Sequence, residues 1–262
     1  MSDLDTNRVE QASRGSDRLF YPIFALAMAI TVLFGFSFTY FIPLTSGEYP
    51  RQAPFLHVHG WSYFIWYALF LVQTILIASG RTSLHMLLGK LSIALAVVMT
   101  VTGFFVLFVR MDDAMQGGGD GFMDLLRFVG ALMFSEMLLF AAFYAAAIVK
   151  AIKGKFDEHK RLMVVTSSVG LAAALSRDFI VIFGGALWTG PGGFIATNLF
   201  IVAAMIYDRL TYGQVHRIYW ICLSLALGTE LMLSPFEGNY IVAALHQAMA
   251  TAGEFLRPFY IY

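Results

Sequence analysis

Seven stretches of this sequence are long and apolar enough to cross a lipid bilayer as helices. A membrane helix needs about 20 mostly apolar residues, because the bilayer core holds no water and each backbone N–H and C=O must be satisfied within the segment. The predicted spans are Phe20–Leu44, His57–Ser79, His85–Val109, Phe122–Val149, Leu162–Gly184, Phe194–Tyr207 (extended to about Leu210) and Ile218–Ser234. Only 13% of the 262 residues are charged, against about 25% in soluble domains. We therefore expect an all-α, polytopic membrane helical bundle of about seven transmembrane helices.

The basic residues predict the orientation of this bundle, because cytoplasmic loops of membrane proteins are enriched in Lys and Arg. With a cytoplasmic N-terminus, the outer side holds only Arg51, Arg110 and Arg257. The inner side then holds Arg8, Arg14, Arg18, Arg81, Lys90, Lys150, Lys153, Lys155, Lys160, Arg161, Arg209 and Arg217. We therefore expect the N-terminus inside, in a bacterial inner membrane.

Three segments follow from these assignments. Residues 1–19 form a polar cytoplasmic segment, residues 20–234 form the seven-helix bundle, and residues 235–262 form a periplasmic interfacial helix and tail. The stretch 240–256 is apolar but contains His246 and Glu254, and Pro235 separates it from the seventh span. These features favour a helix lying in the interface over an eighth crossing.

Charge and cysteine content exclude other classes of protein. The 17 basic residues balance 17 acidic ones, so no net field attracts nucleic acid, and the expected partner is the lipid bilayer. The single cysteine, Cys222, has no second cysteine with which to pair. A disulfide framework and a metal site made of cysteines are therefore excluded.

Three histidines predicted on the cytoplasmic side begin spans and lie near basic residues: His85, His159 and His216. A helix N-terminus disfavours protonated imidazole, so these rings are expected to be neutral and able to bind a metal. One hypothesis is a metal site made by the three histidines, with Asp208 as the fourth ligand. The alternatives are a basic belt that holds anionic lipid headgroups and ordinary packing.

A second pair of histidines, His57 and His59, begins the second predicted span. Residues two apart share a face in an extended chain but point about 200° apart in a helix. A joint metal or cofactor site therefore requires extended backbone between them, which Pro54 favours. If His57 is already helical, only one of the two faces the bundle. Hydrogen bonding within the bundle and anchoring at the membrane interface are the alternatives.

Several charged or amide side chains lie inside the predicted spans. An ionisable group in hydrocarbon costs at least a few kcal/mol, so these groups should face the bundle interior. They predict a polar cavity open toward the periplasm, whose members are His57, His59, Glu136, Arg177, Asp178, Asn198 and Glu230. The structural alternative is that Arg177 pairs with Glu136 or Glu230 to tie helices together. In that alternative Asp178 points to the outer interface.

The polar residues at the helix starts follow a pattern along the chain. It consists of His57-x-His59-Gly60, Gln73, Gly80-Arg81, Leu84-His85 and Gly89, and later His159-Lys160-Arg161-Leu162-Met163. This pattern resembles a large family of uncharacterised bacterial multi-pass membrane proteins, in which an Arg-x-x-x-His-x-x-x-Gly sequence begins a helix. The resemblance covers roughly residues 56–163 and implies the membrane fold without an activity.

The histidines at both membrane surfaces also give a remote likeness to cytochrome b-type transmembrane electron carriers. In those proteins, histidines from four consecutive helices hold haem. This chain departs from that pattern because its fourth span contains no histidine. An outer haem would need His57 or His59 with His246, and an inner haem would need two of His85, His159 and His216.

Two hypotheses for function follow. The first is an inner-membrane protein whose outer-half cavity binds a metal, haem or a small lipophilic ligand for redox chemistry. Its candidate cofactors are haem b or a divalent metal, and its candidate partners are quinone or another lipophilic molecule and a larger membrane complex. The alternative is a non-catalytic membrane subunit or a transporter in which the same charges are structural.

Overall fold

The computed structural model describes residues 3–117, 121–184, 189–234 and 236–260, and all regular structure within them is helical. Five long helices are α1 (Asp3–Phe36), α3 (Pro54–Ala78), α4 (Thr82–Met115), α5 (Gly121–Ile152) and α8 (Thr189–Tyr212). The shorter elements are η1 (Ser37–Phe41), α2 (Ile42–Ser46), α6 (Phe156–Val169), α7 (Ala172–Phe183), α9 (Arg217–Met232), α10 (Tyr240–Leu256) and η2 (Arg257–Phe259). Residue 235, predicted as a break, lies outside the described residues.

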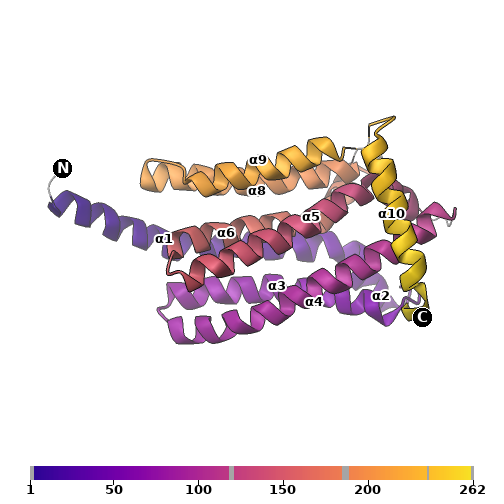
Figure 1. Cartoon of the computed structure of the whole chain (residues 1–262). Helices are drawn as coiled ribbons and strands as arrows, with labels where there is room; N and C mark the ends of the chain where they lie inside the picture. Colours follow the sequence, from indigo (N-terminus) through magenta and orange to yellow (C-terminus); the bar gives the residue numbers. More distant parts are fainter. Residues whose placement is uncertain (1–2, 118–120, 185–188, 235, 261–262) are drawn as a thin grey trace.

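The long helices run side by side as a bundle, and α10 crosses one end of it (Figure 1). We name this the α10 end, and the opposite end, toward which the N-terminus projects, the N-terminal end. The turns that follow α3, α5 and α8 all lie at the N-terminal end (Figure 1). Large side chains such as Trp66, Phe140 and Tyr219 fill the core between the helices.

The chain is a multi-pass membrane protein by the length and composition of its helices. Among the described residues, five helices are long and apolar enough to cross a membrane, and the bent pair α6–α7 makes a sixth candidate. Exposed Leu, Ile and Val side chains cover these helices, for example Ile30, Leu91 and Leu199. Helix α9 has 16 residues and is shorter than the roughly 20 that span a bilayer.

The predicted fifth span is divided into two helices. α6 ends at Val169 and α7 begins at Ala172, with a bend of 45° between them. Side chains of α3 support the break: the Tyr67 hydroxyl donates to the carbonyl oxygen of Ser167 at 2.8 Å, and Trp66 Nε1 donates to Ser167 Oγ at 3.3 Å. Irregular backbone at membrane depth is tolerated where neighbouring protein groups satisfy it.

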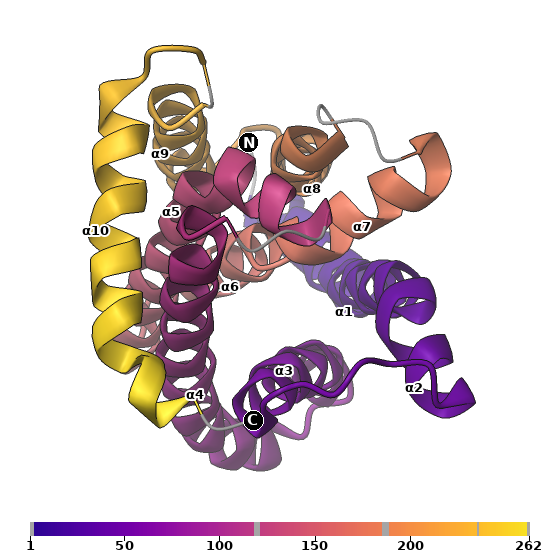
Figure 2. The same ribbon diagram turned by 90° about the vertical axis from the view of Figure 1, so that its right-hand side faces the viewer.

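Helix α10 lies across the bundle instead of along it, over the ends of α4, α5 and α9 (Figure 2). Two polar contacts hold it. His246 Nε2 accepts a hydrogen bond from the backbone N–H of Ala131 at 3.1 Å. Beyond the helix, Arg257 pairs with Asp112 and with Asp113 on α4, and these carboxylates raise the pKa of Arg257.

Candidate functional site

Three buried polar side chains form a cluster between α5, α8 and α9. We call Glu136, Asn198 and Glu230 the carboxyl cluster. Asn198 Nδ2 donates to both carboxylate oxygens of Glu230, at 2.8 Å each. Neither carboxylate oxygen of Glu136 has a hydrogen-bond partner among the described residues, and Glu136 is only 5% exposed. The cluster therefore contains a carboxyl group buried without a partner.

Helical periodicity explains why these side chains point inward. On α5, Leu132, Glu136 and Phe140 are spaced four residues apart and all are buried. On α9, Ala226 and Glu230 are also four apart and buried. Residues at this spacing lie on the same helix face, so the apolar packing that buries one also buries the others. The carboxyl groups thus lie on faces that the bundle covers.

Aromatic rings of α3 lie beside the carboxyl cluster. The Tyr63 ring centroid is 6.3 Å from that of Phe140, one helical turn from Glu136 on α5, and Trp66 is 5.0 Å from the same ring. His59 lies one turn before Tyr63, and the two rings meet edge to face at 4.9 Å. The cluster is therefore bordered by an aromatic wall.

The histidines of α3 do not act together, because α3 already begins at Pro54. The His57 ring makes a 2.9 Å hydrogen bond with the Tyr40 hydroxyl on η1. The His59 ring instead turns toward α4, where Nδ1 lies 3.5 Å from Thr102 Oγ1. The extended backbone that joint metal binding requires is absent here, since the described helix includes both residues. These contacts agree with the predicted alternative of hydrogen bonding within the bundle.

Arg177 does not tie helices through the predicted ion pair. Its guanidinium lies 4.3 Å from the centroid of the Phe36 ring and donates to the Ala173 carbonyl at 2.8 Å. Within the described chain it forms no salt bridge with Glu136 or Glu230. The described structure therefore does not contain the ion pair of the structural alternative, and α7 places Arg177 over Phe36 of α1 instead.

Asp178 also differs from that alternative, which placed it at the outer interface. The side chain is 7% exposed and faces α1. A Cβ built on Gly35 would lie 2.6 Å from Asp178 Oδ1 and 2.5 Å from the Ala174 carbonyl oxygen. The absence of a side chain at Gly35 thus allows α1 to approach α7 closely and bury Asp178.

Two of the three histidines predicted to form the cytoplasmic metal site have hydrogen bonds of their own at the N-terminal end. His159 Nδ1 lies 2.9 Å from the Ala147 carbonyl oxygen, and His216 Nδ1 accepts from the backbone N–H of Ile218 at 3.2 Å, capping α9. Burial and the charge of Arg161 lower the pKa of His216, which favours this neutral acceptor. His85 Nδ1 is buried without a partner in the described structure. No group of three or more His, Cys, Asp or Glu able to hold a metal occurs among the described residues.

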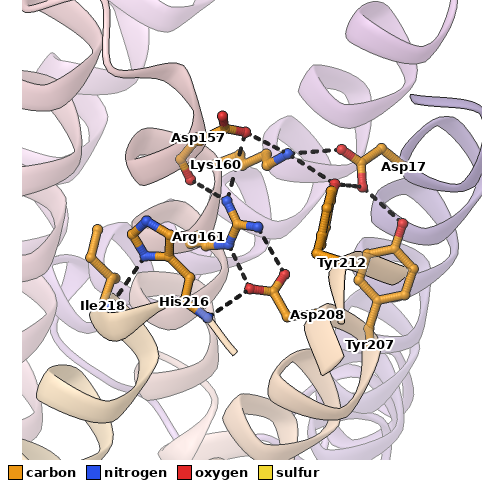
Figure 3. A network of polar contacts seen from close by, with 9 residues as sticks. All are labelled: Asp17, Asp157, Lys160, Arg161, Tyr207, Asp208, Tyr212, His216 and Ile218. Carbon is orange, nitrogen blue, oxygen red and sulfur yellow. Dashed lines mark hydrogen bonds and ion pairs between the residues drawn. The ribbon is translucent and has the colours of Figure 1, made fainter. Parts of the chain in front are cut away.

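Asp208, the hypothesised fourth metal ligand, is instead bound by Arg161 (Figure 3). Arg161 Nε donates to Asp208 Oδ2 at 2.8 Å and Nη2 donates to Oδ1 at 3.1 Å, while the backbone N–H of His216 donates to Oδ2 at 3.2 Å. Arg161 is 4% exposed. It therefore belongs to the bundle interior and not to a lipid-facing basic belt.

A second set of contacts extends this interior network to α1 (Figure 3). Lys160 pairs with Asp17 at 2.8 Å and with Asp157 at 2.9 Å. Asp17 also accepts hydrogen bonds from the hydroxyls of Tyr207 and Tyr212, at 2.8 and 2.6 Å. These bonds tie α1, α6 and α8 together at the N-terminal end.

Sequence reasoning missed most of this network. Asp17 lies in the segment predicted as a polar extension, Tyr207 lies at the end of a predicted span, and Tyr212 lies just beyond that span. The spacing of Lys160 and Arg161 from Asp157 gave the only local signal, because pairs three and four residues apart meet on one helix face. The partners on α1 and α8 are too distant in sequence for such a rule.

No protein-family model, no curated protein and no solved structure matches this chain.

The carboxyl cluster and the network at the N-terminal end differ in what they can do chemically. The network satisfies its charges with opposite charges and hydroxyl donors, as a structural tie does. Glu136 has no such partner, and a lone carboxylate in a low dielectric costs several kcal/mol, whereas the same group carrying a proton is neutral. The arrangement of the carboxyl cluster therefore suits uptake and release of a proton.

Proposed function

We propose that this chain is a proton-coupled membrane protein that binds a small ligand at the carboxyl cluster, with Glu136 as the proton-carrying group. It is a transporter, as in the second hypothesis from the sequence, but with a proton-carrying carboxyl group where that hypothesis had charges that are only structural. The single observation that carries the proposal is the burial of Glu136 without a hydrogen bond or ion pair from the described residues. Intramembrane carboxyl groups of this kind mark proton and substrate pathways.

The position of Glu136 supports this function. It lies at the middle of α5, close enough to Glu230 of α9 and Tyr63 of α3 for their charges to interact. Two carboxyl groups close together in a low dielectric do not both ionise readily, because their charges repel. A proton on one of the two relieves this repulsion, so binding of a proton and binding of a cation compete at the same place.

The proposal includes the topology of seven crossings with the N-terminus inside, in the bacterial inner membrane. α9 supports the seventh crossing because it runs along α8 from the same end of the bundle (Figure 1). The inside assignment is supported by basic residues at the turns of the N-terminal end, among them Arg81, Lys153 and Arg217. With this orientation, Glu136 lies near the middle of the membrane, and Asn198 and Glu230 lie in its periplasmic half.

The haem, metal and quinone hypotheses stay predictions without a comparable structural observation. His57 is engaged by Tyr40, and His246 by the backbone of α5. Two of the three histidines considered for an outer haem, His57 and His246, therefore make hydrogen bonds within the helix packing. Redox chemistry is accordingly left out of the proposal.

Infrared spectroscopy of the purified protein tests the proposal. The difference spectrum between acidic and alkaline samples should contain the carbonyl band of a protonated carboxyl group in an apolar environment. This band should disappear in Glu136→Gln and persist in Glu254→Gln, an exposed carboxyl on α10. Thermal unfolding of both variants verifies that they are folded. A spectrum that Glu136→Gln leaves unchanged would refute the proposal, because Glu136 would then not exchange a proton.

A further inference from the structure

The atoms of the carboxyl cluster that lack a partner are all hydrogen-bond acceptors. They are both carboxylate oxygens of Glu136 and Oδ1 of Asn198, whose side chains are each 5% exposed. The Asn198 amide nitrogen is already used by Glu230. Once Glu136 has released its proton, a ligand that satisfies these three oxygens must donate hydrogen bonds, since a group that only accepts them would leave every one unpaired.

The charge of the surroundings specifies the ligand further. Neither Glu136 nor Glu230 forms an ion pair in the part of the chain that the structure describes. The half-buried Arg177 contacts the Phe36 ring and a backbone carbonyl. The other titratable side chains facing Glu136 are the phenols Tyr63 and Tyr67 of α3. An anion would be repelled at this place, whereas a cation would neutralise the carboxylate that receives it.

The aromatic wall adds a second kind of recognition. The ring centroids of Tyr63 and Trp66 lie 6.3 Å and 5.0 Å from that of Phe140, which is one helical turn from Glu136 on α5. Aromatic faces attract ammonium groups, and this attraction is largest where water is excluded. The rings also give apolar contact to a hydrocarbon substituent on the ligand.

We propose that the carboxyl cluster binds a primary or secondary ammonium ion with an apolar substituent, and that it exchanges this cation for the proton of Glu136. The inference rests on the proposed function and names its substrate class. The protonated carboxyl releases H⁺ to the solvent, and the ammonium N–H groups then donate to the resulting carboxylate and to Asn198 Oδ1. One positive charge enters for each that leaves, so the buried site keeps its net charge. A quaternary ammonium ion has no N–H and satisfies none of these oxygens.

Calorimetry on the purified protein in detergent tests this proposal with benzylammonium as the probe. Titrations in two buffers of different ionisation enthalpy give the number of protons released on binding. At a pH where Glu136 is protonated, we expect about one proton per benzylammonium. Benzyltrimethylammonium, which keeps the ring and the charge but lacks N–H groups, should bind at least roughly tenfold more weakly, the loss expected for leaving buried acceptors unpaired.

Matched variants locate the site. Glu136→Gln should abolish proton release and weaken benzylammonium binding at least roughly tenfold, whereas Glu254→Gln should change neither. Glu136→Asp keeps a carboxyl group and should retain proton release, which separates loss of the site from loss of folding. Equal binding of the two cations, or benzylammonium binding that Glu136→Gln does not alter, would overturn the assignment. If the infrared carboxyl band depends on Glu136 but benzylammonium does not bind, only the substrate class is refuted. If the band is absent, the proposed function is refuted as well.

Discussion

The buried pair of Arg161 and Asp208 gives the sharpest test of what holds the N-terminal end together. The Asp208 side chain is 0% exposed and the Arg161 side chain 5%. Asp208→Asn keeps the size of the side chain and removes its charge, so the buried guanidinium loses its buried counter-charge and keeps only the exposed Asp157, 3.7 Å away. Arg161→Met in the same chain then removes that orphaned charge and retains a long apolar side chain.

The expected magnitude follows from this burial. Removing one partner of a buried pair costs about 3–5 kcal/mol, which for a chain of this size lowers the unfolding midpoint by about 6–20 °C. Asp157 provides the control: it contacts Lys160 and Arg161 as well, but its side chain is 78% exposed. Exposed ion pairs contribute about 0–1 kcal/mol, so Asp157→Asn should lower the midpoint by less than about 4 °C.

Thermal unfolding in one detergent, followed by circular dichroism, measures these effects. We expect Asp208→Asn to be strongly destabilised, Asp157→Asn to stay near the original protein, and the double variant Arg161→Met, Asp208→Asn to recover much of the loss. Equal shifts in Asp208→Asn and Asp157→Asn would refute the reasoning, because burial would then not decide the cost. A double variant less stable than Asp208→Asn would show that the orphaned charge is not the cause.

Two further predictions concern the docking of α10. Burial lowers the pKa of His246, so the folded protein binds this proton less readily than the unfolded chain. Its contribution to stability is therefore present above about pH 6.5 and is lost as the pH falls. The slope of stability against pH below neutrality should be smaller in His246→Gln, and an unchanged slope would contradict this. Gly253→Ala should loosen α10, because its Cβ would lie 2.0 Å from the Phe108 carbonyl oxygen. A protease should then cleave the C-terminal segment of Gly253→Ala faster than that of the original protein. Gly228→Ala is the control: its Cβ would meet no atom within 4 Å, so its cleavage rate should not increase.

The membrane class and the approximate ends of the helices could be predicted from the sequence. Both depend on apolar length, which is a local property: the predicted span His57–Ser79 corresponds to α3 at Pro54–Ala78, and His85–Val109 lies within α4. The count of seven and the orientation depend on a short helix and on charge statistics, and they stay predictions. Candidate site residues could be found where polar side chains interrupt apolar runs, as Glu136 does.

The partners of these residues could not be predicted, because they depend on how the helices rotate and pack. Arg161 and Asp208 are 47 residues apart, and no local spacing rule joins them. Arg177 was expected beside a carboxylate, but the rotation of α7 places it over Phe36. The break after Val169 was missed for the same reason, since the side chains that satisfy its backbone come from α3.

This break allows a final prediction about Gly170, which lies between α6 and α7. Its φ of −63° suits any residue, so the glycine is not required by the backbone conformation. A Cβ there would instead lie 2.8 Å from the Tyr67 hydroxyl oxygen, the group that donates to Ser167. Gly170→Ala should therefore displace that hydroxyl and cost about 1–3 kcal/mol, the penalty for an unpaired buried carbonyl, and Tyr67→Phe alone should cost a similar amount.

The two changes together should not add. With the hydroxyl gone, the nearest atoms to the new Cβ are ring carbons of Phe140 at 3.5 and 3.6 Å, which are ordinary contacts. In the Tyr67→Phe background, Gly170→Ala should then stabilise the protein by about 0.4–1 kcal/mol, because alanine restricts the unfolded chain more than glycine does. Thermal unfolding of the four proteins measures this change of sign. If the double variant instead loses the sum of the two single stability losses, Gly170 is required for a reason other than its contact with Tyr67. The explanation that Tyr67 of α3 supports the break between α6 and α7 would then fail.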